Sequence, residues 1–105
     1  MTKITGQNAW LLVRQSVQVG ERLNTWSVAR GNLGSSFVVE EISEDGLKIR
    51  LDGIGTVRTL SSISFDRLGE VWDNYVARKV ARHQLLKLSH NTSYALPLLK
   101  RVSNL

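Results

Sequence analysis

The chain has 105 residues, 42% of them apolar, and its 14 Lys and Arg residues outnumber its 9 Asp and Glu residues to give a net charge of +5. This length and composition predict one globular domain over residues 1–105 and argue against a low-complexity chain. No apolar run is long enough to span a bilayer and no signal peptide is visible, so we expect a cytoplasmic protein without a membrane partner. Without cysteine and with two histidines, we expect neither disulfides, nor a metal, nor another cofactor.

The first quarter of the chain predicts one helix followed by one strand. Apolar residues recur at helical spacing over residues 7–19, and a glycine follows as a stop signal. Residues 22–28 alternate between polar and apolar types, which is typical of a half-buried strand. The two glycines of residues 31–34 predict a loop that ends this strand.

The middle of the chain predicts an antiparallel meander. Residues 37–42 and 47–51 are strand-like and flank an acidic turn that ends in glycine, so they predict a hairpin. A second glycine-containing turn leads into a further strand at residues 56–60. Three cations of this sheet would share one surface, either a binding face or an ordinary solvated face, and they are Lys48, Arg50 and Arg58.

A covering helix is predicted over residues 64–76, with Ser64 as its N-cap. Its large side chains recur at steps of three and four residues and include Phe65, Trp72 and Tyr75. Such a stripe could serve as a stacking platform for bases, but aromatic residues at helical spacing more often belong to a core. We therefore expect this helix to pack its aromatic stripe on the sheet.

Two further helices are predicted over residues 81–88 and 94–102, separated by a turn at residues 90–93. Ser93 or Asn91 would then be the N-cap of the last helix. Pro97 then falls close to the first turn of the last helix, where proline is tolerated. The expected fold class is α+β: an N-terminal helix, a three- or four-stranded mostly antiparallel sheet, a covering helix and a C-terminal helix-turn-helix-like pair.

The charge distribution points to a polyanionic partner. Asp73 is the last acidic side chain, and every charged side chain beyond it is cationic or a histidine. Clustered cations bind a nucleic acid by releasing its counterions, without reading its sequence. The turn before the last helix could add contacts to phosphates or base edges, as in a helix-turn-helix, although two packed helices with no such role fit equally well. The candidate nucleic-acid-binding residues are Arg78, Lys79, Arg82, Lys87, Asn91, Thr92, Ser93, Lys100 and Arg101.

Several stretches between Thr25 and Leu99 carry a family resemblance, and the most specific is the run Asn-Thr-Ser-Tyr-Ala-Leu-Pro-Leu-Leu at residues 91–99. The hairpin sequence Glu-Asp-Gly-Leu-Lys-Ile at residues 44–49 also belongs to it but is generic to many small α+β domains. The chain resembles a small module attached to, or encoded beside, bacterial restriction endonucleases and other defence proteins. The resemblance implies engagement of double-stranded DNA or a regulatory contact with a nuclease partner, in a stand-alone accessory role. No catalytic motif carries over from it.

Two enzymatic alternatives are weaker. A metal-dependent nuclease would have to use Asp45 and Asp52 with Lys48, but both acids occupy turns in which aspartate is favoured anyway. A metal-independent ribonuclease toxin would use His83 or His90 as its acid and base, although the sequence provides no second acid–base group beside either. We therefore expect a protein that is not an enzyme.

A protein-binding role, as an inhibitor or a homodimer, is the main alternative to DNA binding. Three tryptophans are many for a chain of this size, and one left exposed would mark an interface. The strand edge near residues 22–30 could also pair across a dimer axis. The sequence does not say which tryptophans are buried.

Overall fold

The computed structural model describes residues 3–27, 30–80, 82–85 and 92–103, with residues 32, 82 and 83 described in their backbone only. Its antiparallel sheet has the strand order β1 (Arg22–Ser27), β2 (Gly31–Ile42), β3 (Gly46–Leu51) and β4 (Val57–Ser61). The helices are α1 (Ala9–Ser16), α2 (Ser62–Glu70), α3 (Trp72–Val76), α4 (Arg82–Leu85) and α5 (Thr92–Ser103). The predicted α+β class is confirmed, including the C-terminal helical pair.

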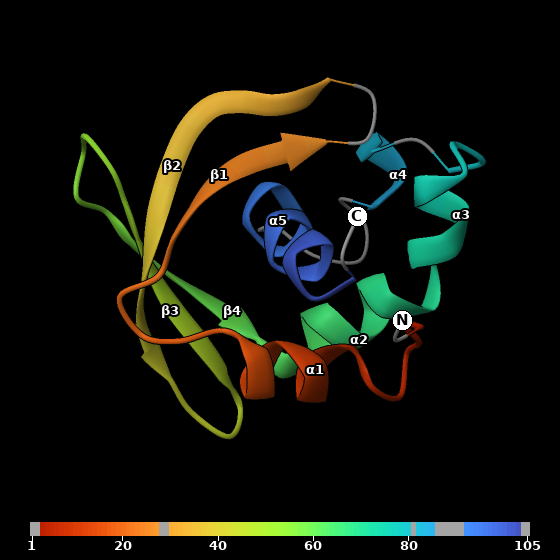
Figure 1. Ribbon diagram of the computed structural model, residues 1–105, viewed down its shortest axis with the longest axis horizontal. Coiled ribbons are helices and arrows are strands. Elements are labelled where there is room, and N and C mark those ends of the chain that lie inside the picture. Colours follow the sequence, from red (N-terminus) through yellow and green to blue (C-terminus); the bar gives the residue numbers. More distant parts are fainter. Residues whose placement is uncertain (1–2, 28–29, 81, 86–91, 104–105) are drawn as a thin grey trace.

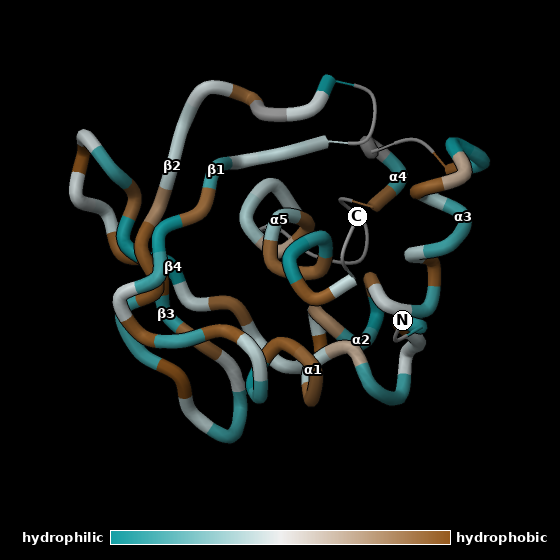
Figure 2. The backbone as a smooth tube through the Cα atoms, viewed as in Figure 1, coloured by the Kyte–Doolittle hydropathy of each residue, from teal (hydrophilic) through white to brown (hydrophobic). Residues whose placement is uncertain are grey.

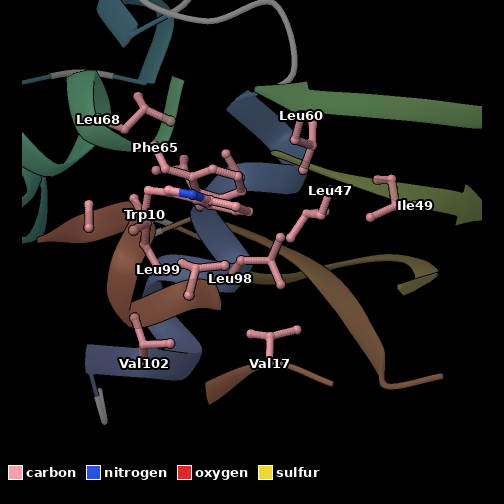
Figure 3. Packing of buried hydrophobic residues seen from close by; sticks show 14 of the residues in the cluster. Trp10, Val17, Leu47, Ile49, Leu60, Phe65, Leu68, Leu98, Leu99 and Val102 are labelled. Carbon is pink, nitrogen blue, oxygen red and sulfur yellow. The ribbon is translucent and has the colours of Figure 1, made fainter. Parts of the chain in front are cut away.

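The core is built around α5. The sheet curves around this helix, while α1 and α2 lie along one side of it and α3 and α4 along another (Figure 1). Residues 95–99 of α5 are all buried, and five consecutive residues cover every direction around a helix. Leu98 and Leu99 are fully enclosed, among side chains that include Trp10 of α1, Leu47 of β3 and Leu60 of β4 (Figure 3).

Strand β2 pairs irregularly with both of its neighbours, and against β3 the register shifts between Val39 and Glu41. Between β1 and β2 the register shifts, because Asn24 pairs with Ser36 whereas Trp26 pairs with Asn32. The extra β2 residues lie between Asn32 and Ser36 and form a bulge that contains Gly34, whose φ is 88°, a conformation in which glycine is not strained. The prediction of a loop over residues 31–34 is therefore wrong, since this segment is the bulged beginning of β2.

The predicted helix over residues 64–76 is divided in two. Ser61, not Ser64, is the N-cap of α2, because the Ser61 hydroxyl accepts the Ser64 N–H at 3.2 Å. The helix α2 ends with a 3₁₀-type hydrogen bond, from the Val71 N–H to the Leu68 carbonyl three residues earlier (3.2 Å). Helix α3 begins at the next residue. The expectation that the aromatic stripe is core is confirmed, since Phe65, Trp72 and Tyr75 are all buried.

The last helix begins earlier than predicted. Thr92 and Ser93 belong to its first turn, so these two residues are not part of a turn before the helix, Ser93 is not its cap, and Pro97 lies in the helix interior. Asn91, the other predicted cap, lies outside the described residues. With 12 residues, α5 is the longest helix in the described ranges. No helix in these ranges is long and apolar enough to cross a membrane.

Candidate nucleic-acid interface

The outer face of the sheet is electrically balanced. Lys48 forms an ion pair with Glu41 at 3.6 Å, and Arg50 forms one with Glu40. The register pairs Arg58 with Ile49, a core residue, so Arg58 belongs to the opposite face from Lys48 and Arg50. The three sheet cations therefore do not form one basic surface.

Asp52 neutralises a further cation at the rim of the sheet. It accepts a hydrogen bond from the Ser36 hydroxyl and lies 3.0 Å from the Arg22 Nε. The Ser36 hydrogen bond is the main cause that lowers the pKa of Asp52, with help from Arg22 and against a smaller opposing effect of desolvation. Asp52 is thus charged at neutral pH and committed to partners within the fold.

Arg101 also has partners within the protein. Its guanidinium pairs with Glu21 and donates from Nη2 to the carbonyl of Ser16 at 3.1 Å. Ser16 is the last residue of α1, so the arginine caps a helix C-terminus and interacts favourably with its dipole. The Arg101 side chain therefore ties α5 to α1, and any contact with a ligand would compete with these bonds.

An aromatic cluster joins three distant segments of the chain. The ring of Trp26, near the end of β1, lies 6.1 Å from the ring of Trp72 and 6.2 Å from that of Tyr75, both in α3. On α5, the Lys100 Nζ lies 5.4 Å from the centre of the Trp26 ring, which is cation–π geometry. Lys100 is thereby held close to α3, although more than 20 residues separate the two in sequence.

Two more cations directly follow α3, which carries the other rings of this cluster. The N–H groups of Arg78 and Lys79 bond to the carbonyls of Tyr75 (3.0 Å) and Asn74 (2.8 Å), which is the pattern of a Schellman C-cap. Arg78 occupies the position where glycine is usual and has a φ of 62°. Both side chains are exposed directly after the buried Tyr75.

Arg30 completes the group. Its backbone N–H bonds to the Ser27 hydroxyl at 3.2 Å, so it lies near the end of β1 that carries Trp26. No described carboxylate pairs with Arg30, Lys79 or Lys100, and the neighbouring Asp73 is engaged by Lys3 at 3.6 Å. We call the four cations on the segments that meet at this cluster the Trp26 corner, and they are Arg30, Arg78, Lys79 and Lys100.

The predicted site residues are thus only partly brought together. Arg78, Lys79 and Lys100 share the Trp26 corner, whereas Arg101 faces α1. Ser93 is half-buried in the first turn of α5. Lys87 and Asn91 lie outside the described residues, as does the side chain of Arg82, whose backbone belongs to α4.

Two expectations about the helix-turn-helix pair need correction. Thr92 is fully buried, with its hydroxyl 3.5 Å from the Leu85 carbonyl, so it is not placed to touch a phosphate or a base. The other is α5 itself, which the sheet and helices enclose, so its middle turns cannot enter a DNA groove as a recognition helix would. Its accessible cations are those of its last turn.

The aromatic side chains do not offer a stacking surface. All seven Trp, Tyr and Phe residues lie in the described ranges, and six of them are buried. Tyr94 is half-buried and meets the ring of Phe37 edge-on, with 5.7 Å between the ring centres. No tryptophan is therefore exposed as a protein-binding anchor, which removes one of the two features on which that prediction relied. The other feature, the strand edge near residues 22–30, is present because β1 is the first strand in the order of the sheet.

Within the part of the chain that the structure describes, the residues of the metal-dependent nuclease alternative are not brought together. Asp45 precedes β3 and Asp52 follows it, so at the rise of an extended strand they are roughly 20 Å apart. Within the described ranges, no group of three or more His, Asp or Glu side chains is close enough to hold a metal ion. The side chains of His83 and His90 fall outside those ranges.

No known protein family, curated protein or solved structure matches the chain.

Proposed function

We propose that this protein binds double-stranded DNA without catalysing a reaction, and that it contacts the phosphate backbone through the Trp26 corner. The proposal depends on one observation, the four cations of the Trp26 corner. Asp73, the carboxylate of α3, forms its ion pair with Lys3 and not with any of these four cations. Elsewhere, cations such as Lys48, Arg50 and Arg101 are matched by acids of the fold. The Trp26 corner is therefore a place where three cations without a described acidic partner, Arg30, Lys79 and Lys100, belong to segments that meet at one aromatic cluster.

The aromatic cluster makes the corner a suitable phosphate-binding surface. The packed rings of Trp26, Trp72 and Tyr75 join β1 to α3, and Lys100 joins α5 to the same cluster, so the cations lie on segments that pack against one another. Arg78 sits in a backbone conformation that costs a non-glycine residue about 1 kcal/mol. A cation kept at such a position is consistent with a binding role, because local strain tends to persist at functional sites.

Contacts to the backbone rather than to bases fit the remaining surface. Single-strand binding proteins stack bases on exposed aromatic rings, and the rings of this chain are buried or half-buried. Sequence-specific readers insert a helix or a β-ribbon into the major groove, and α5 is enclosed in the core. The expected binding is thus non-specific and strongly dependent on salt.

The resemblance to modules of restriction and defence systems suggests what such binding would serve. A small protein that holds DNA without reading its sequence could bring a nuclease partner to its substrate or regulate access to it. The run at residues 91–99, the most specific part of that resemblance, is mostly buried in the described structure. We therefore place the DNA contact at the Trp26 corner rather than in that run.

The salt dependence of DNA binding tests this proposal. Four phosphate contacts predict a log–log slope of about −3.6, which is a loss of roughly 150-fold in affinity between 50 and 200 mM salt. The test variant combines R30Q, K79Q and K100Q. The control variant makes the same change in charge at exposed arginines of α1, β4 and α2 that have no described acidic partner, namely R14Q, R58Q and R67Q.

Fluorescence anisotropy of a labelled duplex, titrated in EDTA at several salt concentrations, gives the slope for each protein. In the test variant we expect the slope of log affinity against log salt to become shallower by about 2.7, and in the control variant we expect it to stay nearly unchanged. Equal losses in the two variants would mean that only total charge matters and that the corner is not the site. Absence of binding by the unaltered protein at low salt would overturn the function itself.

A further inference from the structure

The strand β4 is an accessible edge of the sheet. Four of its five residues are exposed, and only Leu60 is buried. Just before the strand, the Leu51 N–H donates to the Thr56 carbonyl at 2.8 Å, so the Thr56 carbonyl points toward β3. Because successive residues of a strand direct their peptide groups to opposite sides, the peptide groups of Val57 point away from β3. An added strand could bond to them.

Exposed aliphatic side chains gather along this edge. Val57 in β4 is 47% exposed, Ile54 in the turn before it is 74% exposed, and Ile63 in the first turn of α2 is 60% exposed. Figure 2 shows the hydrophobic colour reaching the outer part of the β3–β4 turn, away from the core. The exposed large apolar residues thus lie before, within and after an open edge strand, which is consistent with a site that another chain covers.

The two faces of the edge differ in chemistry. Register pairs Val57 with Arg50 on the outer face of the sheet, and Arg58 with Ile49 on the opposite face. Arg58 and Arg67, which lies one turn after Ile63, are exposed, and no described carboxylate pairs with either. A strand added beside β4 also alternates, so its residues next to Val57 should be aliphatic and those next to Arg58 acidic.

We propose that the β4 edge binds an extended segment of a partner protein in which aliphatic and acidic residues alternate, by addition of a strand to the sheet. Charge complementarity favours such a segment over a second copy of this chain. Each copy carries a net charge of +5, and β4 contains Arg58 but no acidic residue that could balance the Arg58 of a partner copy. In Figure 1 this edge lies across the molecule from α3 and α4, so the site is separate from the Trp26 corner.

A peptide of about eight residues in which valine and glutamate alternate is a suitable probe, with a twin that carries lysine in place of glutamate. Anisotropy measures the affinity of the labelled peptide, and amide chemical-shift changes in the isotopically labelled protein locate its site. We expect the glutamate peptide to shift the amides of β4 and the lysine peptide to leave them unchanged. The R58E variant should weaken binding of the glutamate peptide by about tenfold or more.

Two variants separate this site from charge alone. R14E makes the same change in charge on the exposed face of α1 and should bind the peptide nearly as the unaltered protein does. V57P removes an N–H that faces away from β3, a position where an edge strand tolerates proline, and should weaken binding while thermal unfolding remains cooperative.

Three results would overturn the proposal. One is that the glutamate peptide causes no β4 shifts at about 1 mM, and another is that R58E and R14E weaken its binding equally. The third is a dimer in sedimentation that V57P dissociates, since the occupant of the edge would then be a second copy.

Discussion

Replacing Gly46 by alanine tests the packing of β3 against β4. A Cβ atom built on Gly46 would lie 2.2 Å from the carbonyl oxygen of Leu60 in β4. Ordinary contacts of this kind are near 3.4 Å, so the two strands would have to separate by about 1 Å. Over-packing costs about 1–3 kcal/mol, and a weakened hydrogen bond of the ladder adds about 1 kcal/mol. We expect a total of about 3 kcal/mol.

Gly53→Ala is the matched control. Gly53 has a φ of 89°, with no atom within 4 Å of its Cβ position, so its substitution introduces backbone strain alone, about 1 kcal/mol. Urea unfolding followed by tryptophan fluorescence measures both free energies. In a thermal melt, G46A should lower the Tm by about 12 °C or more, at about 4 °C per kcal/mol. If G46A is no less stable than G53A, the close approach of Gly46 to Leu60 is wrong, and so is the register of β3 and β4.

Two further predictions concern Arg78 and Asp52. Arg78→Gly relieves a positive φ, so the free energy of unfolding should stay the same or rise by up to about 1 kcal/mol. The same change removes a cation, so the slope of log affinity against log salt for DNA binding should become shallower by about one. A destabilised variant with unchanged binding would contradict both the strained backbone and the DNA contact of Arg78. Because the pKa of Asp52 is lowered in the folded state, its ionised form stabilises the fold at neutral pH, and this contribution is lost as the pH falls below 3.8 and through the folded-state pKa. Ser36→Ala removes the main cause, so urea midpoints at pH 7 and pH 3 should differ less in S36A than in the unaltered protein, and an unchanged difference would refute this cause.

Turn residues and hydrophobic spacing in the sequence predict two parts of this fold correctly. The hairpin between β2 and β3 follows from its turn, and the burial of Trp72 and Tyr75 follows from their helical spacing. The prediction for the glycines of residues 31–34 was wrong, because glycine adopts a positive φ in a loop and in a bulge alike. In this chain Gly34 adopts it in a bulge of β2.

The candidate site was less predictable than the fold. The charge pattern identifies Arg78, Lys79 and Lys100, but their association with Trp26 depends on contacts between residues far apart in sequence. Arg30 was missed, because its only local signal is its position shortly after a tryptophan-bearing strand. For α5, Lys100 and Arg101 suggested an exposed helix, yet these cations lie in its last turn and the turns before them are enclosed.

The position of α5 has a consequence for how the protein is made. During synthesis, all four strands leave the ribosome before the helix on which their concave apolar face packs. Contacts between α5 and β1 join residues about 70 positions apart, and closing such long loops makes folding slow. We therefore expect the nascent sheet to remain unfolded, and to be a substrate for chaperones that bind apolar segments, until the last helix has been translated.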